Sequence, residues 1–184
     1  MMEGINLRSW MTLLEQEAIA KYAKKCHSLV IELGTFRAGT TEILCQNVPA
    51  DCVVITIDNY NTIDLKGYSD YNPIEIYEYL KKYPNCIVVV GDSALTAILV
   101  QNTYGLDHPC SGMSVDMVIV DAGHDYNDTK RNAIAWKDYT RYLIFHDYDP
   151  SREAGVVKAA NEIRDSGDWT VMEMIDSLLI LERR

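Results

Sequence analysis

Short apolar runs recur along the chain, and polar or glycine-containing residues separate each run from the next. Runs of this length that are rich in valine and isoleucine are typical of buried strands. They predict strands at residues 29–33, 53–57, 86–90, 115–120 and 142–145. Two further runs cover residues 169–175 and 178–182. Only Asp176 and Ser177 separate this last pair, and so short a link forces an antiparallel hairpin.

Apolar residues at helical spacing fill the intervals between the runs. In residues 7–26 they recur at Leu7, Trp10, Met11, Leu14, Ala18 and Tyr22. This segment predicts an N-terminal helical cap (residues 1–27) over one edge of the sheet, with a dimer contact or a substrate lid as alternatives. Further helices are expected at residues 40–47, 73–82, 94–102, 127–138 and 153–165. The expected caps are Thr40 and Thr41 for the first of these, Ser93 for the third, and Asn127 or Asp128 for the fourth.

Strand and helix alternate from residue 28 to the final hairpin. This alternation predicts an α/β fold, a three-layer sandwich in which helices cover both faces of a mostly parallel sheet. No repeat, low-complexity tract or interdomain linker interrupts the pattern. We therefore expect a single domain over residues 1–184, with its core in residues 28–184.

The composition narrows the class of protein. The five cysteines form no C-x-x-C pair, and an odd number of scattered thiols is typical of a reduced, cytoplasmic protein. No secretory signal is visible at the N-terminus, and no apolar stretch reaches the length of a membrane span. The net charge of −10 opposes binding to nucleic acid or to an anionic membrane. It favours a neutral or cationic small ligand, or a protein partner.

Acidic residues follow the predicted parallel strands. Four strands end in an acid, and the third ends in a glycine followed by an acid; the residues are Glu32, Asp58, Asp92, Asp121 and Asp147. The carboxyl ends of parallel strands meet at one edge of the sheet, where ligands of open α/β sheets bind. Carboxylates gathered there would repel one another unless a cation or a hydroxyl-rich ligand lay among them.

Residues 29–41 read LVIELGTFRAGTT, the pattern of a buried strand, a glycine turn and the start of a helix. A dinucleotide-binding turn needs a second glycine where Phe36 stands, and Glu42 adds negative charge to the first helical turn. A phosphate-binding loop needs a lysine where Thr40 stands. The pattern instead suits S-adenosylmethionine, which has no phosphate, carries a sulfonium and an ammonium group, and offers a ribose diol to carboxylates.

Four stretches then match a known family in order: IELGTFRAGTT, VITIDNY, VVGDSAL and VDMVIVDAGHDYNDTKRNAIAW…YLIFHDYD. They resemble the class I S-adenosylmethionine-dependent methyltransferases, above all a small O-methyltransferase-like subgroup (family 24-like) with an Asp-Gly/Ala-x-His turn after the fourth strand. The resemblance covers about residues 27 to 150. It implies a Rossmann-like, seven-stranded sheet of order 3-2-1-4-5-7-6. It also implies cofactor contacts at Glu32, Gly34, Thr35, Phe36, Gly39, Asp58, Asp92, Ser93 and Asp121.

The resemblance also implies roles for these residues. Asp58 would accept both ribose hydroxyls, and Asp92 with Ser93 would lie beside the adenine. The alternatives are capping or solvation at a strand end for Glu32 and Asp58, and helix capping for Asp92. Asp121 would lie at the transfer site. His124 would act as the general base, because the ordinary pKa of histidine lies near neutrality. The alternative for His124 is a hydrogen bond to the backbone of its own turn.

Asp121, His146 and Asp147 form a candidate site for a divalent cation. Carboxylate oxygens suit Mg²⁺, whereas the imidazole of His146 suits a transition metal better. Such an ion would lower the pKa of a substrate hydroxyl. A structural role for His146 at the same edge is the alternative.

The expected function is transfer of a methyl group from S-adenosylmethionine to a small-molecule acceptor, at oxygen. The segments left to recognise the acceptor are residues 1–26, 59–72, 104–114 and 148–152, or a second subunit of a homodimer. Candidate acceptor contacts are Tyr60, Tyr68, Tyr71, Tyr126 and Tyr148. Two alternatives remain: a binding protein that keeps the fold without catalysis, and a dinucleotide-binding oxidoreductase, which Phe36 and Glu42 disfavour.

Overall fold

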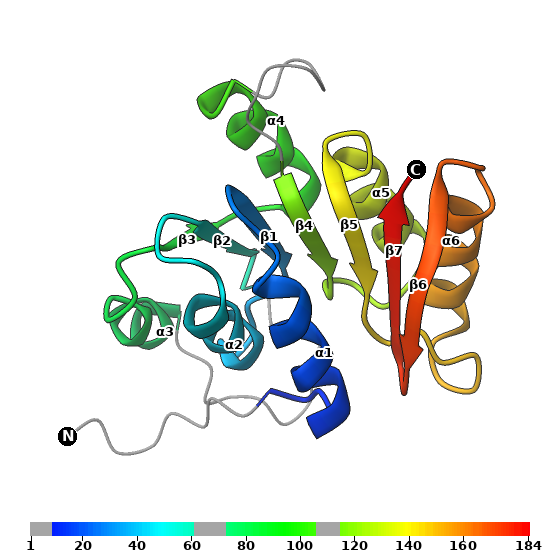
Figure 1. Ribbon diagram of the computed structural model, residues 1–184, viewed down its shortest axis with the longest axis horizontal. Helices are drawn as coiled ribbons and strands as arrows, with labels where there is room; N and C mark the ends of the chain where they lie inside the picture. Colours follow the sequence, from blue (N-terminus) through cyan, green and yellow to red (C-terminus); the bar gives the residue numbers. More distant parts are fainter. Residues whose placement is uncertain (1–8, 61–72, 106–114) are drawn as a thin grey trace.

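The computed structural model describes residues 9–60, 73–105 and 115–184 (Figure 1). Its helices are α1 (Leu13–Ala23), α2 (Gly39–Asn47), α3 (Pro73–Leu80), α4 (Ser93–Thr103), α5 (Tyr126–Trp136) and α6 (Ala154–Arg164). Its strands are β1 (Leu29–Leu33), β2 (Val53–Asp58), β3 (Cys86–Val90), β4 (Val115–Val120), β5 (Thr140–Phe145), β6 (Trp169–Ile175) and β7 (Leu178–Arg183). Residues 1–8, 61–72 and 106–114 lie outside the described residues. They include Tyr68 and Tyr71, so the expectations for these two tyrosines concern residues that the structure does not describe.

All of these strands form one seven-stranded sheet in the order β3-β2-β1-β4-β5-β7-β6. Neighbours among β1 to β5 run parallel, whereas β7 runs antiparallel to both β5 and β6. The strand order and the C-terminal hairpin that the sequence predicts are therefore confirmed. The predicted strand positions are confirmed too, although β5 begins earlier than expected, at Thr140.

The central strands are buried on both faces, as their largely apolar sequences predict. Every residue of β1 and β4 is buried. From β1, Leu29, Ile31 and Leu33 contact the core formed with α4, α5 and α6, whereas Val30 contacts the core formed with α1 and α2. The two groups of helices therefore cover opposite faces of the sheet and complete the three-layer sandwich (Figure 1).

Helix α1 begins later than its apolar spacing predicts, at Leu13 rather than Leu7. Thr12 caps it: the Thr12 hydroxyl accepts a hydrogen bond from the Glu15 amide, and the Glu15 carboxylate accepts one from the Thr12 amide. This reciprocal capping box fixes the first turn. Trp10 therefore precedes the helix, and it is 60% exposed rather than part of a buried helical face.

Three other helices begin on caps that differ from the predicted ones. Ala38, in a left-handed conformation, precedes α2, so Thr40 and Thr41 lie inside that helix and are buried. Asp92 rather than Ser93 caps α4, and Asp125 rather than Asn127 or Asp128 caps α5. In each of the last two cases a carboxylate accepts two amide hydrogen bonds, which is a stronger cap than a hydroxyl gives. No helix within the described ranges combines the length and the apolar character that a membrane span needs.

Candidate functional site

A cavity of about 440 Å³ opens at the carboxyl edge of the sheet. Nearly all of the residues that the sequence singled out line it: Gly34, Thr35, Phe36, Gly39, Asp58, Asp92, Ser93, Asp121, His124, His146 and Asp147. They come from turns that are far apart in the sequence, and the parallel sheet brings them together. Glu32 does not line the cavity, and neither do the candidate acceptor contacts Tyr60, Tyr126 and Tyr148.

The glycine turn after β1 touches the end of β4 through backbone atoms. Gly34 has a φ of +100°, and a Cβ atom added to it would lie 2.2 Å from the carbonyl oxygen of Asp121. Both the backbone angle and the missing space require glycine at this position. The turn and Asp121 are thereby held side by side at the floor of the cavity.

Three amide groups of this turn are engaged within the protein. Gly34 N donates to the Ile57 carbonyl (2.8 Å), Phe36 N donates to the Asp58 carboxylate (2.9 Å), and Ala38 N donates to the Thr35 carbonyl (2.7 Å). A phosphate-binding loop presents such amides to its ligand. These three amides are therefore not presented to a ligand in this structure.

Asp58 and Asp92 both accept hydrogen bonds from backbone amides. Besides the Phe36 amide, Asp58 accepts the Tyr60 amide (2.7 Å) on its other oxygen. Asp92 accepts two amides at the start of α4 and both ends of the Arg131 guanidinium (2.9 and 3.2 Å). Asp92 is thus largely satisfied within the protein.

Glu32 lies beneath the glycine turn, 1% exposed. One of its carboxyl oxygens accepts hydrogen bonds from the hydroxyls of Thr41 and Thr56, and the other has no hydrogen-bond partner among the described residues. Burial, reinforced by the charge of Asp121, raises the pKa of Glu32 to about 8 despite the two hydroxyl donors. Glu32 therefore carries a proton at neutral pH. Its predicted contact with a cofactor stays a prediction.

Glu42 lies outside the cavity. Its carboxylate accepts hydrogen bonds from Tyr79 (2.8 Å), Tyr83 (2.7 Å) and Lys82 (3.1 Å) on the side of α3. These partners offset the negative charge of Glu42, which was expected to disfavour a phosphate ligand. A dinucleotide is consequently disfavoured by the Phe36 side chain and by the three engaged amides of the turn, those of Gly34, Phe36 and Ala38.

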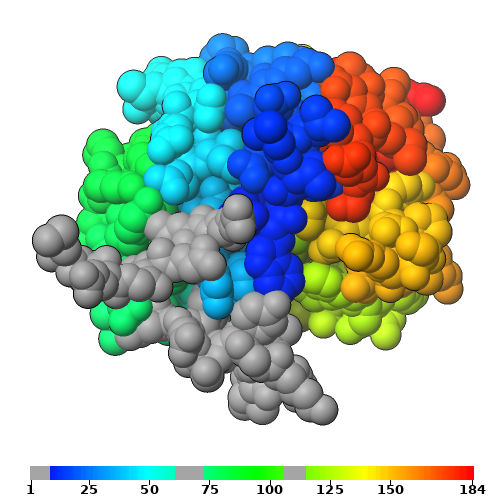
Figure 2. All heavy atoms as spheres, turned by 90° about the horizontal axis from the view of Figure 1, so that it is seen from below, coloured from blue at the N-terminus to red at the C-terminus, as the bar shows by residue number. Residues whose placement is uncertain are grey.

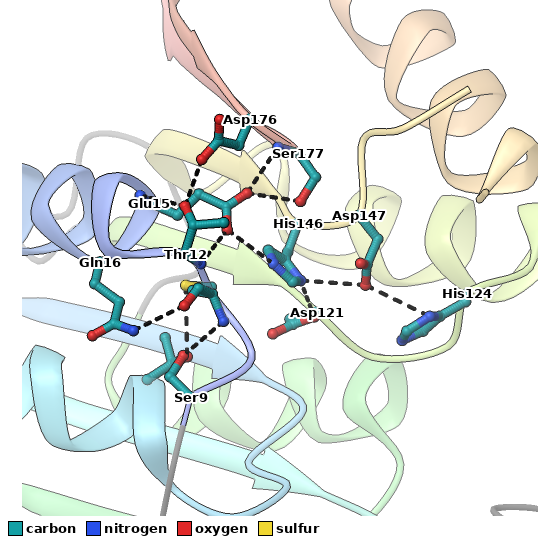
Figure 3. A network of polar contacts seen from close by, with 12 residues as sticks. Ser9, Thr12, Glu15, Gln16, Asp121, His124, His146, Asp147, Asp176 and Ser177 are labelled. Atoms are coloured by element: carbon teal, nitrogen blue, oxygen red, sulfur yellow. Dashed lines mark hydrogen bonds and ion pairs between the residues drawn. The ribbon is translucent and has the colours of Figure 1, made fainter. Parts of the chain in front are cut away.

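His146 lies behind Asp121, 7% exposed. Its Nδ1 is 3.0 Å from the Asp121 carboxylate and 3.2 Å from that of Asp147, and its Nε2 is 3.7 Å from that of Glu15. Burial by itself lowers the pKa of His146, but the charge and hydrogen bond of Asp121, with Asp147 and Glu15, outweigh it and raise the pKa to about 12. His146 is therefore an imidazolium with carboxylates on both sides (Figure 3).

His124 and Asp147 face each other across the mouth of the cavity (Figure 3). His124 Nδ1 lies 3.5 Å from Asp147 and 3.7 Å from Glu153, and the His124 side chain is 51% exposed. A carboxylate oxygen of Asp121, a ring nitrogen of His124 and a carboxylate oxygen of Asp147 all lie within 4.8 Å of one another. These three side chains present two carboxylates and one imidazole to the same space.

Several lining residues were not predicted from the sequence: Arg131, Asn132 and Ser177. Ser9, Met11, Thr12 and Glu15 also line the cavity and lie in the segment 1–26 that the sequence left for acceptor recognition, although none was predicted individually as a site residue. Seen onto the carboxyl edge, the N-terminal segment and α1 lie between α2 and the C-terminal hairpin (Figure 2). The spacing Thr12-x-x-Glu15 was a readable signal for a helix start, but nothing local in the sequence connects Glu15 with Ser177.

The strand order of the sheet is that of the Rossmann-like methyltransferase fold. Three solved O-methyltransferase structures, each 14% identical in sequence, share this fold. NovP matches with a TM-score of 0.68 over 96% of this chain and 82% of its own. The calicheamicin methyltransferase CalS11 matches with 0.67 over 92% and 77%. TomG from Streptomyces achromogenes, solved in complex with S-adenosylmethionine, matches with 0.64 over 94% and 81%.

No family model matches the chain, and no curated protein sequence does.

Proposed function

We propose that this protein is an S-adenosylmethionine-dependent methyltransferase that transfers a methyl group to the oxygen of a small-molecule acceptor. The observation that carries the proposal is the cavity at the carboxyl edge, where Gly34, Asp58 and Asp121 meet. The structural neighbours are O-methyltransferases, and TomG was solved with this cofactor. The residues act as one domain over 1–184.

The residues present fit the cofactor. Acids outnumber bases among the charged side chains that line the cavity, which suits a ligand with a sulfonium and an ammonium group. The Asp58 carboxylate lines the cavity and is of the kind that accepts a ribose diol, and the amides of Gly34, Phe36 and Ala38 are engaged by the protein. When bound, the cofactor supplies an electrophilic methyl group on sulfur.

The chain's own residues would orient the acceptor and remove its proton. Asp121 lies against the glycine turn, so an acceptor hydroxyl beside it is held next to the cofactor site. His124 is the base of this proposal: Asp147 and Glu153 face its Nδ1 and orient the ring. Trp10 and Phe36, in edge-to-face contact with ring centroids 5.1 Å apart, form an aromatic side of the cavity.

A divalent cation fits the same group of side chains. Asp121, Asp147 and His124 would hold it, and in that state His124 would be a ligand and not the base, so the ion would take over activation of the hydroxyl. His146, which the sequence assigned to the metal, has both ring nitrogens beside carboxylates. Two carboxylates with an imidazole suit Mn²⁺ or Zn²⁺ better than Mg²⁺. The ion would act as a Lewis acid on the acceptor hydroxyl. In calorimetry with Mn²⁺ we expect heat that Asp147→Asn abolishes; equal heat in that variant would contradict the assignment.

The cofactor is tested by calorimetry with S-adenosylhomocysteine. We expect binding by the wild-type protein, and affinity lower by roughly tenfold to a hundredfold in Asp58→Ala, because charge-assisted hydrogen bonds to the ribose are lost. Asp51→Ala, which removes an exposed acid just before β2, is the matched control and should bind normally. The absence of heat at millimolar ligand, or a response to NADH instead, would refute the proposal.

The base is tested separately by His124→Ala. This variant should keep its affinity for S-adenosylhomocysteine and lose roughly a hundredfold or more in turnover of an acceptor found by screening small hydroxyl compounds. Unchanged turnover would remove the base assignment and leave the cofactor assignment intact.

The same proposal covers partners and location. The acceptor is a small molecule, with neither nucleic acid nor a membrane involved, and the protein works as a homodimer in the cytoplasm. The free thiols of Cys26, Cys45, Cys52 and Cys86 support a reducing compartment. Light scattering measures the mass in solution, and a monomer would contradict the dimer.

A further inference from the structure

Glu15 is a buried acid in the first turn of α1, 1% exposed. One carboxylate oxygen accepts the Thr12 amide (2.8 Å), which closes the capping box of the helix. The other oxygen accepts both the amide (2.8 Å) and the hydroxyl (2.7 Å) of Ser177 in the turn between β6 and β7. This one carboxylate therefore joins two elements that lie 162 residues apart in the sequence.

The same carboxylate faces the site. His146 Nε2 lies 3.7 Å from it, on the side of the ring opposite Asp121 and Asp147 (Figure 3). The ring of His146 is thus held between Glu15 on one side and the two carboxylates of the cavity on the other. Removing Glu15 would leave the Nε2 side of the ring without this acidic neighbour.

Glu15 also fixes the N-terminal segment, residues 9–12, which lines the cavity. The Thr12 hydroxyl donates to Asp176 (2.6 Å) in the hairpin turn. At the other end of the segment, Ser9 hydrogen-bonds Thr40 of α2 (3.2 Å). The segment therefore spans from the helix of the glycine turn to the hairpin, and the capping box of Glu15 holds it at Thr12 (Figure 3).

A helix cap alone does not require these contacts. A capping-box glutamate normally lies at the surface and bonds only its own first turn. A carboxylate buried to this extent is costly unless every oxygen is satisfied, and here Ser177 and His146 provide the additional partners. The contacts beyond the cap all lead to the hairpin turn and to the transfer side of the cavity.

We propose that Glu15 is a positioning residue of the transfer site, which holds His146 against Asp121 and Asp147 and fixes residues 9–12 as a wall of the cavity. The proposal rests on the proposed function only for naming this edge the transfer side. Glu15 acts through His146 and the segment, and it does not touch the reacting atoms.

The test compares Glu15→Gln with Asp176→Asn. Glutamine keeps the size of the side chain and removes its charge. Asparagine at position 176 weakens the bond to Thr12 in the same junction without touching Glu15, and it tolerates the positive φ (50°) found there. Two readouts are used: imidazole ¹⁵N signals, with His146 assigned through His146→Gln, and amide hydrogen exchange along residues 9–16 and 170–178.

In Glu15→Gln we expect the His146 ring signals to move and the amides of residues 9–16 to exchange roughly tenfold faster or more. In Asp176→Asn the His146 signals should stay at their wild-type positions. A folded Glu15→Gln protein with unmoved His146 signals would overturn the proposal, since a purely structural cap predicts that result. If Glu15→Gln fails to fold, Glu15→Asp decides: its charge remains but its shorter side chain cannot reach all partners, so the His146 signals should still move.

S-adenosylhomocysteine binding separates this inference from the proposed function. The wild-type protein is used for this measurement, because Glu15 itself lines the cavity. If the wild-type protein does not bind it, the proposed function fails, while the ring signals still judge the role of Glu15.

Discussion

Two side chains at the carboxyl edge of the sheet have protonation states that differ from those usual for their residue types at neutral pH. Glu32 is buried under the glycine turn with two hydroxyl donors and carries a proton at neutral pH, whereas His146, among carboxylates, carries a positive charge. The sequence located both residues correctly at the ends of strands. It could not reveal their protonation, because that depends on neighbours such as Glu15 and Thr56, which come from other elements.

The raised pKa of Glu32 predicts a dependence of stability on pH. In the unfolded chain this carboxyl loses its proton near its ordinary pKa of 4.5, but in the folded protein it keeps the proton up to about pH 8. The contribution of Glu32 to the free energy of unfolding is therefore fully present below pH 4.5. It falls by up to about 1.4 kcal/mol per pH unit as the pH rises toward 8.

Glu32→Gln should remove this slope between about pH 5 and 8, as measured by urea denaturation at several pH values. Glu42→Gln in the same helix–turn region is the control. The pKa of Glu42 is lowered, since the hydrogen bonds from Tyr83, Tyr79 and Lys82 outweigh its burial, so its contribution is constant above pH 5. Parallel slopes for wild type and Glu32→Gln would show that Glu32 is ionised in the folded protein.

At the scale of elements, the strands were easier to predict than the starts of the helices. Runs such as residues 86–90 and 115–120 are short and rich in valine and isoleucine, which favours a strand both in the half-exposed edge strand β3 and in the fully buried β4. The start of a helix depends on which of several neighbouring residues with a suitable side chain caps it. Asp92 and Ser93 are both good caps, and Arg131, which is distant in sequence, stabilises the Asp92 carboxylate.

The cap of α1 predicts a measurable cost. Thr12→Ala removes the hydroxyl that accepts the Glu15 amide and that donates to Asp176, and it should lower the free energy of unfolding by about 1 to 2 kcal/mol. Urea denaturation measures this difference. Thr103→Ala, at the exposed C-terminal end of α4, should change stability by less than about 0.5 kcal/mol. Equal effects in the two variants would mean that α1 does not depend on its capping box.

At the scale of the whole molecule, the topology explains why the site was partly predictable. Parallel strands carry their carboxyl ends to one edge, so Asp58, Asp121 and Asp147 could be grouped from the sequence alone. Glu15 and Ser177 could not be grouped in this way, because a helix and an antiparallel turn reach the edge from outside the parallel pattern. The residues that surround the strand ends could therefore be identified as part of the site only from the structure.

Ligand binding across this edge should stabilise the molecule as one unit. S-adenosylhomocysteine at a hundredfold excess over its Kd should add about 2.7 kcal/mol, which corresponds to a rise in Tm of roughly 5 to 10 °C for a chain of this size. Thermal unfolding with and without ligand measures it, and Asp58→Ala at the same ligand concentration should rise less. A rise that is unchanged in Asp58→Ala would place the ligand elsewhere.

If the protein is the proposed methyltransferase, the close packing of Gly34 against Asp121 also limits how it can acquire new acceptors. Because even a Cβ atom at position 34 would lie 2.2 Å from the Asp121 carbonyl oxygen, the glycine turn and Asp121 must move together or not at all. Directed evolution toward a larger acceptor should therefore accumulate its substitutions along residues 9–12 and near Ser177, and leave position 34 unchanged. The cavity therefore has one part that cannot change, at Gly34 and Asp121, and another that can, at residues 9–12 and near Ser177.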